Sequence, residues 1–127
     1  MNAHPIVHIE IPATDLKATS QFYADVFGWQ IDPSTENYPL FKAEGGPGGG
    51  FVLLTDETTS GPVPFGVGRP LMHLATDDIE ATLATVEAHG GKTLRTKAEI
   101  PGIGWWAVFA DPTGNPIGIF CELPKEA

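Results

Sequence analysis

The sequence predicts an α+β fold of two tandem βαβββ modules, whose strands form a curved mixed sheet around a cleft with the helices outside. Three observations predict it: strand-like alternation of apolar residues, helices bounded by Asp and Gly, and repetition of this order later in the chain. The 127 residues suit one domain, and 42% hydrophobic residues suffice for a core. We expect module one at about 5–55, a linker at about 56–70 and module two at about 71–124.

The first strand is expected at residues 6–12, where apolar and polar residues alternate. His8 and Glu10 share its polar face. A helix should begin after Asp15, a typical N-cap residue, and end at Gly28. Three further strands are expected in this module, near residues 29–31, 38–43 and 51–54.

A glycine-rich run, Gly45–Gly50 with Pro47 inside it, separates two of these strands. A phosphate-binding loop would need a following Lys-Ser/Thr and a helix start, which this run lacks. We therefore interpret it as a flexible hairpin connection. Residues 55–70, rich in Gly and Pro, are interpreted as a linker.

The second module repeats the pattern of the first. A strand at 71–76 is followed by Asp77 or Asp78 as the N-cap of a helix that Gly90-Gly91 would end. Three more strands and one turn are expected after it, with strands at 92–94, 105–110 and 117–122 and the turn at 111–115.

The two modules align at an offset of 63 residues, which superposes Asp15 on Asp78 and Gly28 on Gly91. Each is too small to bury its sheet alone. Side by side, the inner faces of their strands would line a cleft.

Composition excludes several classes of function. The net charge of −9 opposes nucleic-acid binding, because phosphates would be repelled. The longest apolar runs are far shorter than a membrane span, and the N-terminus does not resemble a secretory signal. The single cysteine, Cys121, cannot form an internal disulfide, so we expect a cytoplasmic protein.

The sequence resembles the vicinal-oxygen-chelate superfamily of glyoxalases, extradiol dioxygenases and bleomycin-resistance proteins. The resemblance covers nearly the whole chain and rests on segments 7–16, 22–29, 77–83, 89–92 and 111–115. Segment 100–105 is similar to the uncharacterised glyoxalase-like branch. The resemblance implies a small organic ligand in the cleft, a homodimer, and, in an enzyme, lyase, isomerase or dioxygenase chemistry.

Metal-dependent members resembling this chain place His and Glu ligands on four strands, around a divalent ion such as Ni, Zn, Mn, Co or Fe. His8 falls at the first-strand ligand position, but its repeat counterpart is Leu71, and the last-strand carboxylate position holds Gly118. His73 and Glu122 lie on the expected faces a few residues farther along. A set of His8, His73 and Glu10 or Glu122 is chemically acceptable. His8, His73 and Glu10 are also the candidate catalytic residues.

Large aromatic residues could form an apolar wall for the ligand or pack the core. Adjacent Trp105 and Trp106 should point to opposite faces of their strand. The candidate ligand contacts are Trp29, Phe41, Phe51, Trp105 and Phe120.

Three functions remain open from the sequence: a metal-assisted enzyme, a metal-free small-molecule or drug-binding protein, and an interaction module without a small ligand. His8 favours the first, whereas Leu71 and Gly118 favour the second.

Overall fold

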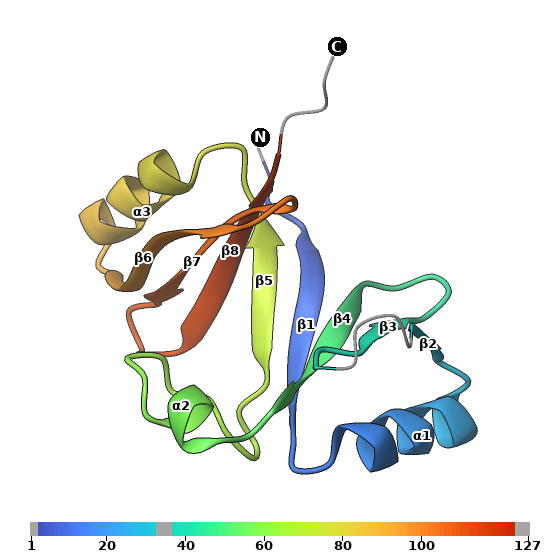
Figure 1. Cartoon of the computed structure of the whole chain (residues 1–127). Coiled ribbons are helices and arrows are strands. Elements are labelled where there is room, and N and C mark those ends of the chain that lie inside the picture. The colour runs from blue at the N-terminus through green and yellow to red at the C-terminus, as the bar shows by residue number, and fades with distance from the viewer. Residues whose placement is uncertain (1–2, 33–36, 124–127) are drawn as a thin grey trace. The chain divides into compact units, whose positions relative to one another are not determined.

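The computed structural model describes residues 3–32 and 37–123 (Figure 1). The chain divides into two compact units. Residues 7–72 form one unit, which we call the α1 unit. Residues 3–6 and 73–123 lie in the other, which we call the α3 unit. The predicted α+β class and the βαβββ order of both modules are confirmed.

The α1 unit contains one mixed sheet and two helices. Strand β1 pairs parallel with β4, whereas β2 and β4 each pair antiparallel with β3, giving the order β2-β3-β4-β1. The strands span Ile6–Ala13 (β1), Gln30–Asp32 (β2), Leu40–Lys42 (β3) and Gly48–Leu53 (β4). The helices span Leu16–Phe27 (α1) and Asp56–Thr59 (α2).

Helix α1 begins and ends where its capping residues predict. The Asp15 carboxylate accepts a hydrogen bond from the Ala18 N–H at 2.9 Å. Gly28 ends the helix with φ = 72°, a left-handed conformation that favours glycine. The apolar side of α1 covers one face of the sheet, where Phe51 is fully buried and Phe41 nearly so.

Strand β4 corrects the expectation for the glycine run. It begins at Gly48, so Gly48, Gly49 and Gly50 are strand residues and only the segment before them turns. A Cβ at Gly49 would collide with the Ile9 carbonyl oxygen and the Phe41 ring. A Cβ at Gly50 would collide with the Tyr38 ring. These glycines thus permit close packing across the sheet rather than flexibility.

Helix α2 corrects part of the linker expectation. The Thr55 hydroxyl accepts from the Thr58 N–H at 3.2 Å, while the Thr58 hydroxyl accepts from the Thr55 N–H at 2.7 Å. This reciprocal capping box stabilises a single helical turn in a segment expected to be irregular.

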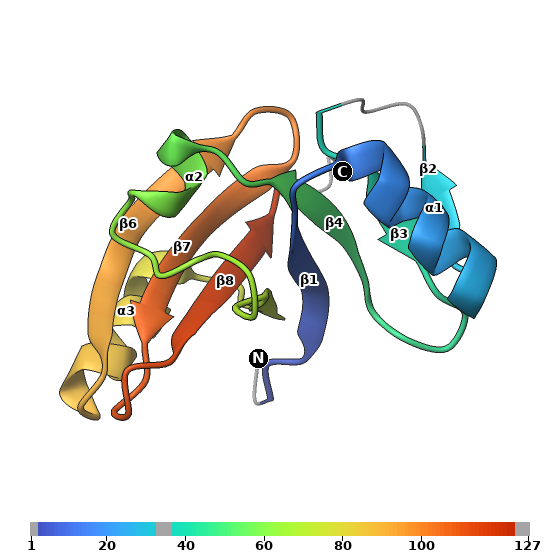
Figure 2. The same ribbon diagram turned by 90° about the horizontal axis from the view of Figure 1, so that it is seen from below.

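The α3 unit has the strand order β5-β8-β7-β6, with β5 parallel to β8 and the other pairs antiparallel. Helix α3 (Ile79–Ala88) lies along one face of β6, β7 and β8 (Figure 2). The strands span Leu71–Ala75 (β5), Lys92–Ile100 (β6), Gly104–Ala110 (β7) and Pro116–Glu122 (β8). Strand β6 is longer than the expected short strand at 92–94 and contains two register shifts.

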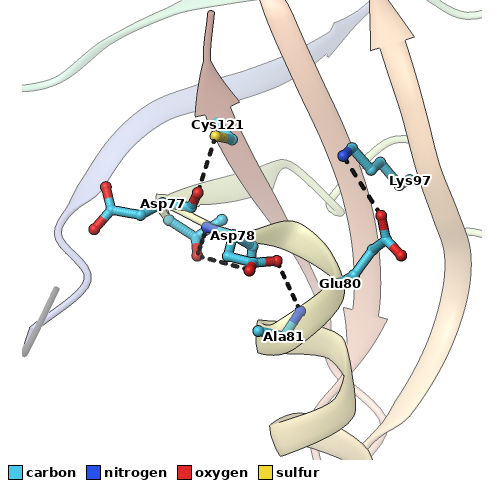
Figure 3. Close-up of polar contacts among 7 residues, drawn as sticks. Asp77, Asp78, Glu80, Ala81, Lys97 and Cys121 are labelled. Carbon is cyan, nitrogen blue, oxygen red and sulfur yellow. Dashed lines mark hydrogen bonds and ion pairs between the residues drawn. The ribbon is translucent and has the colours of Figure 1, made fainter. Parts of the chain in front are cut away.

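The core of the α3 unit lies between α3 and this sheet. Asp78 is the N-cap of α3, and its carboxylate accepts from the Ala81 N–H at 3.0 Å (Figure 3). Cys121 packs against the core, as its place on β8 predicts. The buried core residues are Ile79, Leu83, Ala107 and Ile119.

The first described residues join the α3 unit through β5. The Ala75 N–H donates to the Pro5 carbonyl oxygen at 2.9 Å, and His4 Nδ1 lies 2.7 Å from the Ala75 carbonyl oxygen. The beginning of the chain therefore pairs with a strand of the second module.

None of the helices within residues 3–32 and 37–123 has the length and apolar character needed to cross a membrane.

Candidate functional site

The candidate site lies on the face of the α1 unit's sheet that α1 does not cover. Ile9 and Ile11 of β1 pack into the core under α1, so the alternation of the strand turns His8 and Glu10 to the opposite face. The neighbouring strand pairs Gly48 with His8 and Gly50 with Glu10. Because glycine has no side chain, these two positions leave room above β4.

Tyr38 occupies that room. It precedes β3 instead of lying in it, and its ring lies over Gly50. The Tyr38 hydroxyl is 2.7 Å from His8 Nε2 and donates a hydrogen bond to Glu10 Oε2 at 2.9 Å. All three side chains are partly buried.

The hydrogen bonds fix the direction of donation in this network. A phenol has one hydrogen to donate, and Tyr38 donates it to Glu10. His8 Nε2 must then carry the hydrogen that is donated to Tyr38 Oη. Protons are thus ordered from the imidazole through the phenol to the carboxylate.

Burial raises the pKa of Tyr38 far above its ordinary value of 10.0, and the negative charge of Glu10 and the hydrogen bond to it raise the pKa further. The phenol therefore stays protonated at neutral pH. It acts as a hydrogen-bond bridge between His8 and Glu10.

The donor set does not fit a preformed metal centre. His8 and Glu10, the two predicted ligands in this unit, are both hydrogen bonded to the Tyr38 hydroxyl, which an ion would have to displace. Across residues 3–32 and 37–123, no group of three or more His, Cys, Asp and Glu side chains could hold a metal ion.

His73 lies in the other unit, on the face of its sheet away from α3. Its ring fills the space that a side chain at Gly118 would need. The 63-residue offset makes His73 the repeat counterpart of Glu10, and each is paired in register with a glycine. Glu122 lies four residues beyond Gly118, about 13 Å along β8, so β8 does not bring it beside His73.

Four of the five predicted ligand contacts belong to the two cores. Trp29 stacks between Tyr23 and Phe41 at ring-centroid distances of 4.6 and 4.4 Å, beside buried Phe51. Trp105 packs against the core under α3. These four residues therefore do not share the faces of His8 and His73.

Phe120 is the exception among the five. It lies on the same face of β8 as Gly118, and Trp106 is its register partner on β7. The prediction that Trp105 and Trp106 point to opposite faces is confirmed, because Trp106 approaches His73 while Trp105 approaches the core.

Sequence reasoning missed Tyr38. The spacing placed it in a strand, where it had no distinctive role. The available signal was the pair Gly48 and Gly50 beside two polar residues of β1, since such a gap in a sheet accommodates a ring.

Comparison with known proteins identifies relatives along most of the chain. The family model described as the Glyoxalase/Bleomycin resistance protein/Dioxygenase superfamily matches residues 5–119. The anthracycline biosynthesis protein DnrV of Streptomyces peucetius is 29% identical over 123 residues, covering 87% of this chain and 44% of DnrV. A glyoxylase-like domain-containing protein of Didymella fabae is 30% identical over 118 residues, covering 91% of both. The chain thus spans less than half the length of DnrV.

A solved structure supports the fold. The Mn(II)-bound glyoxalase from Novosphingobium aromaticivorans matches with a TM-score of 0.64 and 22% identity, covering 98% of this chain and 42% of that one.

Proposed function

Because the chain belongs to the Glyoxalase/Bleomycin resistance protein/Dioxygenase superfamily, we propose that it binds a small organic molecule at the His8–Tyr38–Glu10 site. One observation carries the proposal: the Tyr38 hydroxyl joins an imidazole at 2.7 Å to a carboxylate at 2.9 Å on the face away from α1. A network of this kind orients His8 and keeps a proton available to a ligand.

The reaction class that suits this network is proton transfer, as in an isomerase or lyase. His8 is the group that gives a proton to the ligand or takes one from it, and Glu10 stabilises the charged imidazole through Tyr38. A ligand bound without turnover would make the chain a metal-free drug-binding or sequestering protein. Both functions use the same three side chains.

A metal-assisted lyase, isomerase or oxygenase is the second candidate. His8 at the family's first-strand position supports it, as does the Mn(II)-bound glyoxalase among the structural relatives. This function requires His8 and Glu10 to exchange Tyr38 for the ion and to gain further ligands.

Removing one hydroxyl tests the proposal. Tryptophan fluorescence is titrated with cationic glycopeptides, thiol conjugates and aromatic diols, first with a chelator and then with added Mn(II), Ni(II) or Zn(II). Tyr38→Phe should weaken binding about tenfold, because His8 loses a hydrogen-bond acceptor within a charged network. Tyr23→Phe removes a hydroxyl from the core aromatic cluster and should bind as wild type does.

A flat response across the panel, or equal affinity of the Tyr38→Phe and wild-type proteins, would overturn the proposal. Stoichiometric metal binding that disappears in His8→Ala would instead favour the metal-assisted candidate.

We propose a cytoplasmic homodimer and a single domain with modules at about 5–55 and 71–124. The exposed apolar side chains of α1, at Phe22, Val26 and Phe27, support self-association.

A further inference from the structure

We propose that Arg95 and Trp106 of the α3 unit bind the carboxylate of a planar organic anion. These residues lie in a different unit from His8, Glu10 and Tyr38. The inference names an anionic ligand class that the function proposed above does not, and it rests on different residues.

Arg95 is a cation that lies over an aromatic ring. Its guanidinium carbon lies 4.9 Å from the centre of the Trp106 ring. Its Nε atom is buried without a hydrogen-bond partner. Throughout the described part of the chain, no acidic side chain forms an ion pair with Arg95. A guanidinium in this state has unused donors for an anion.

Lys97, a second cation on the same strand, differs from Arg95 because it is paired with a carboxylate. It also lies 4.9 Å over a tryptophan ring, that of Trp105, but its Nζ is paired with Glu80 Oε1 of α3 at 3.6 Å (Figure 3). Arg95 and Lys97 are two residues apart, and the register shift between Arg95 and Ala98 lets them stack on opposite faces of β7. Of these two cations, Lys97 on the α3 side of the sheet is the one that pairs with an acidic side chain among the described residues.

The surroundings of Arg95 are aromatic. Trp106 is the register partner of Phe120, and the His73 ring lies 6.5 Å from the Trp106 ring. The guanidinium is planar, and its N–H edge matches a carboxylate in a bidentate pair. Trp106 and Phe120 offer apolar surface to a ring attached to that carboxylate. An aromatic carboxylate satisfies both requirements.

The chain carries a net charge of −9, which opposes the binding of anions in general. The chain has 16 acidic and 7 basic residues, yet the ring beside the Arg95 guanidinium is aromatic. The acidity of the whole molecule favours cationic ligands in general. Selection of an anion must therefore come from this local arrangement.

Benzoate and benzamide are the matched probes, because they share a ring and differ in charge. Isothermal titration calorimetry on the full chain should show benzoate binding about tenfold more tightly than benzamide, since the charged bidentate pair is lost in the amide. Arg95→Gln should remove this difference. Lys97→Gln removes an equivalent stacked cation from the other face and should leave it unchanged.

Equal affinity for the two probes in the wild-type protein would overturn the inference, and so would undetectable benzoate binding at millimolar concentration. Retention of the benzoate preference in Arg95→Gln would also overturn it. The comparison of probes on the wild-type protein needs no variant, so misfolding of Arg95→Gln would not prevent the test. Failure here is distinct from failure of the Tyr38→Phe experiment, which concerns the other unit.

Discussion

At the scale of single residues, Tyr38 determines the electrostatics of the His8–Glu10 site. Its hydroxyl accepts a hydrogen bond from His8 and donates one to Glu10, so a neutral group links the two ionisable side chains. Because burial and Glu10 both raise its pKa, the phenol resists ionisation in the folded chain but not in the unfolded one.

This difference predicts a loss of stability in alkali. A pKa raised above the unfolded value of 10.0 contributes stability below about pH 10, and the contribution falls as pH rises above it. The fall has a limiting slope of about 1.4 kcal/mol per pH unit. Urea unfolding between pH 9 and 11 should show this fall in the wild-type protein and in Tyr23→Phe, but not in Tyr38→Phe. Parallel curves for all three proteins would contradict it.

The sequence was sufficient to place His8 and Glu10 on one face of β1, since alternation in a half-buried strand determines sidedness. It was not sufficient to find Tyr38. The partners of Tyr38 lie 30 and 28 residues earlier in the chain, and only the pairing of β1 with β4 brings them beside it. The sequence left two roles open for the large aromatic residues, because their size favours burial but does not tell which face of a strand is buried.

At the scale of elements, strand β4 supports the site by having no side chains where Tyr38 lies. A methyl group at Gly50 would overlap the Tyr38 ring and push its hydroxyl away from His8 and Glu10. Overpacking of this kind costs about 1–3 kcal/mol of unfolding free energy.

Gly50→Ala should therefore lower both stability and ligand affinity, as measured by urea unfolding and fluorescence titration. Gly46→Ala is the matched control, because nothing lies within 4 Å of its Cβ position and its φ is ordinary. It should change stability by less than about 0.5 kcal/mol. Wild-type affinity in Gly50→Ala would show that the ring has space to move.

Helices were the most predictable elements, because their capping residues are recognisable in the sequence. Asp15 and Gly28 mark the beginning and end of α1, and Asp78 marks the beginning of α3. The turn at Asp111 was also predictable: its carboxylate accepts three backbone N–H groups, and hydrogen bonding led by the Asn115 amide lowers its pKa. Strand β6 was less predictable, since pairing with β7 sets its length through two register shifts.

At the scale of the whole molecule, the exposed face of α1 leaves several large apolar side chains in water. Phe22 and Val26 are four residues apart and more than half exposed, at 53% and 57%. Helix packing against a second copy would cover them, in agreement with the proposed homodimer.

Sedimentation of the 13.5 kDa chain should therefore show twice that mass at tens of micromolar, and Val26→Glu should shift the protein toward the monomer. Ser60→Glu adds the same charge at an exposed position outside α1 and should leave the dimer intact. A wild-type monomer across this concentration range would refute the homodimer.

The hydrogen bonds of His4 and Pro5 to β5 have a practical consequence for labelling. A fluorophore attached ahead of His4 would sit on the unit that carries Arg95, although His8 is only four residues away in sequence. A change in the emission of that dye would first report a rearrangement of β5, to which His4 and Pro5 are hydrogen bonded, and a dye meant for His8 belongs elsewhere.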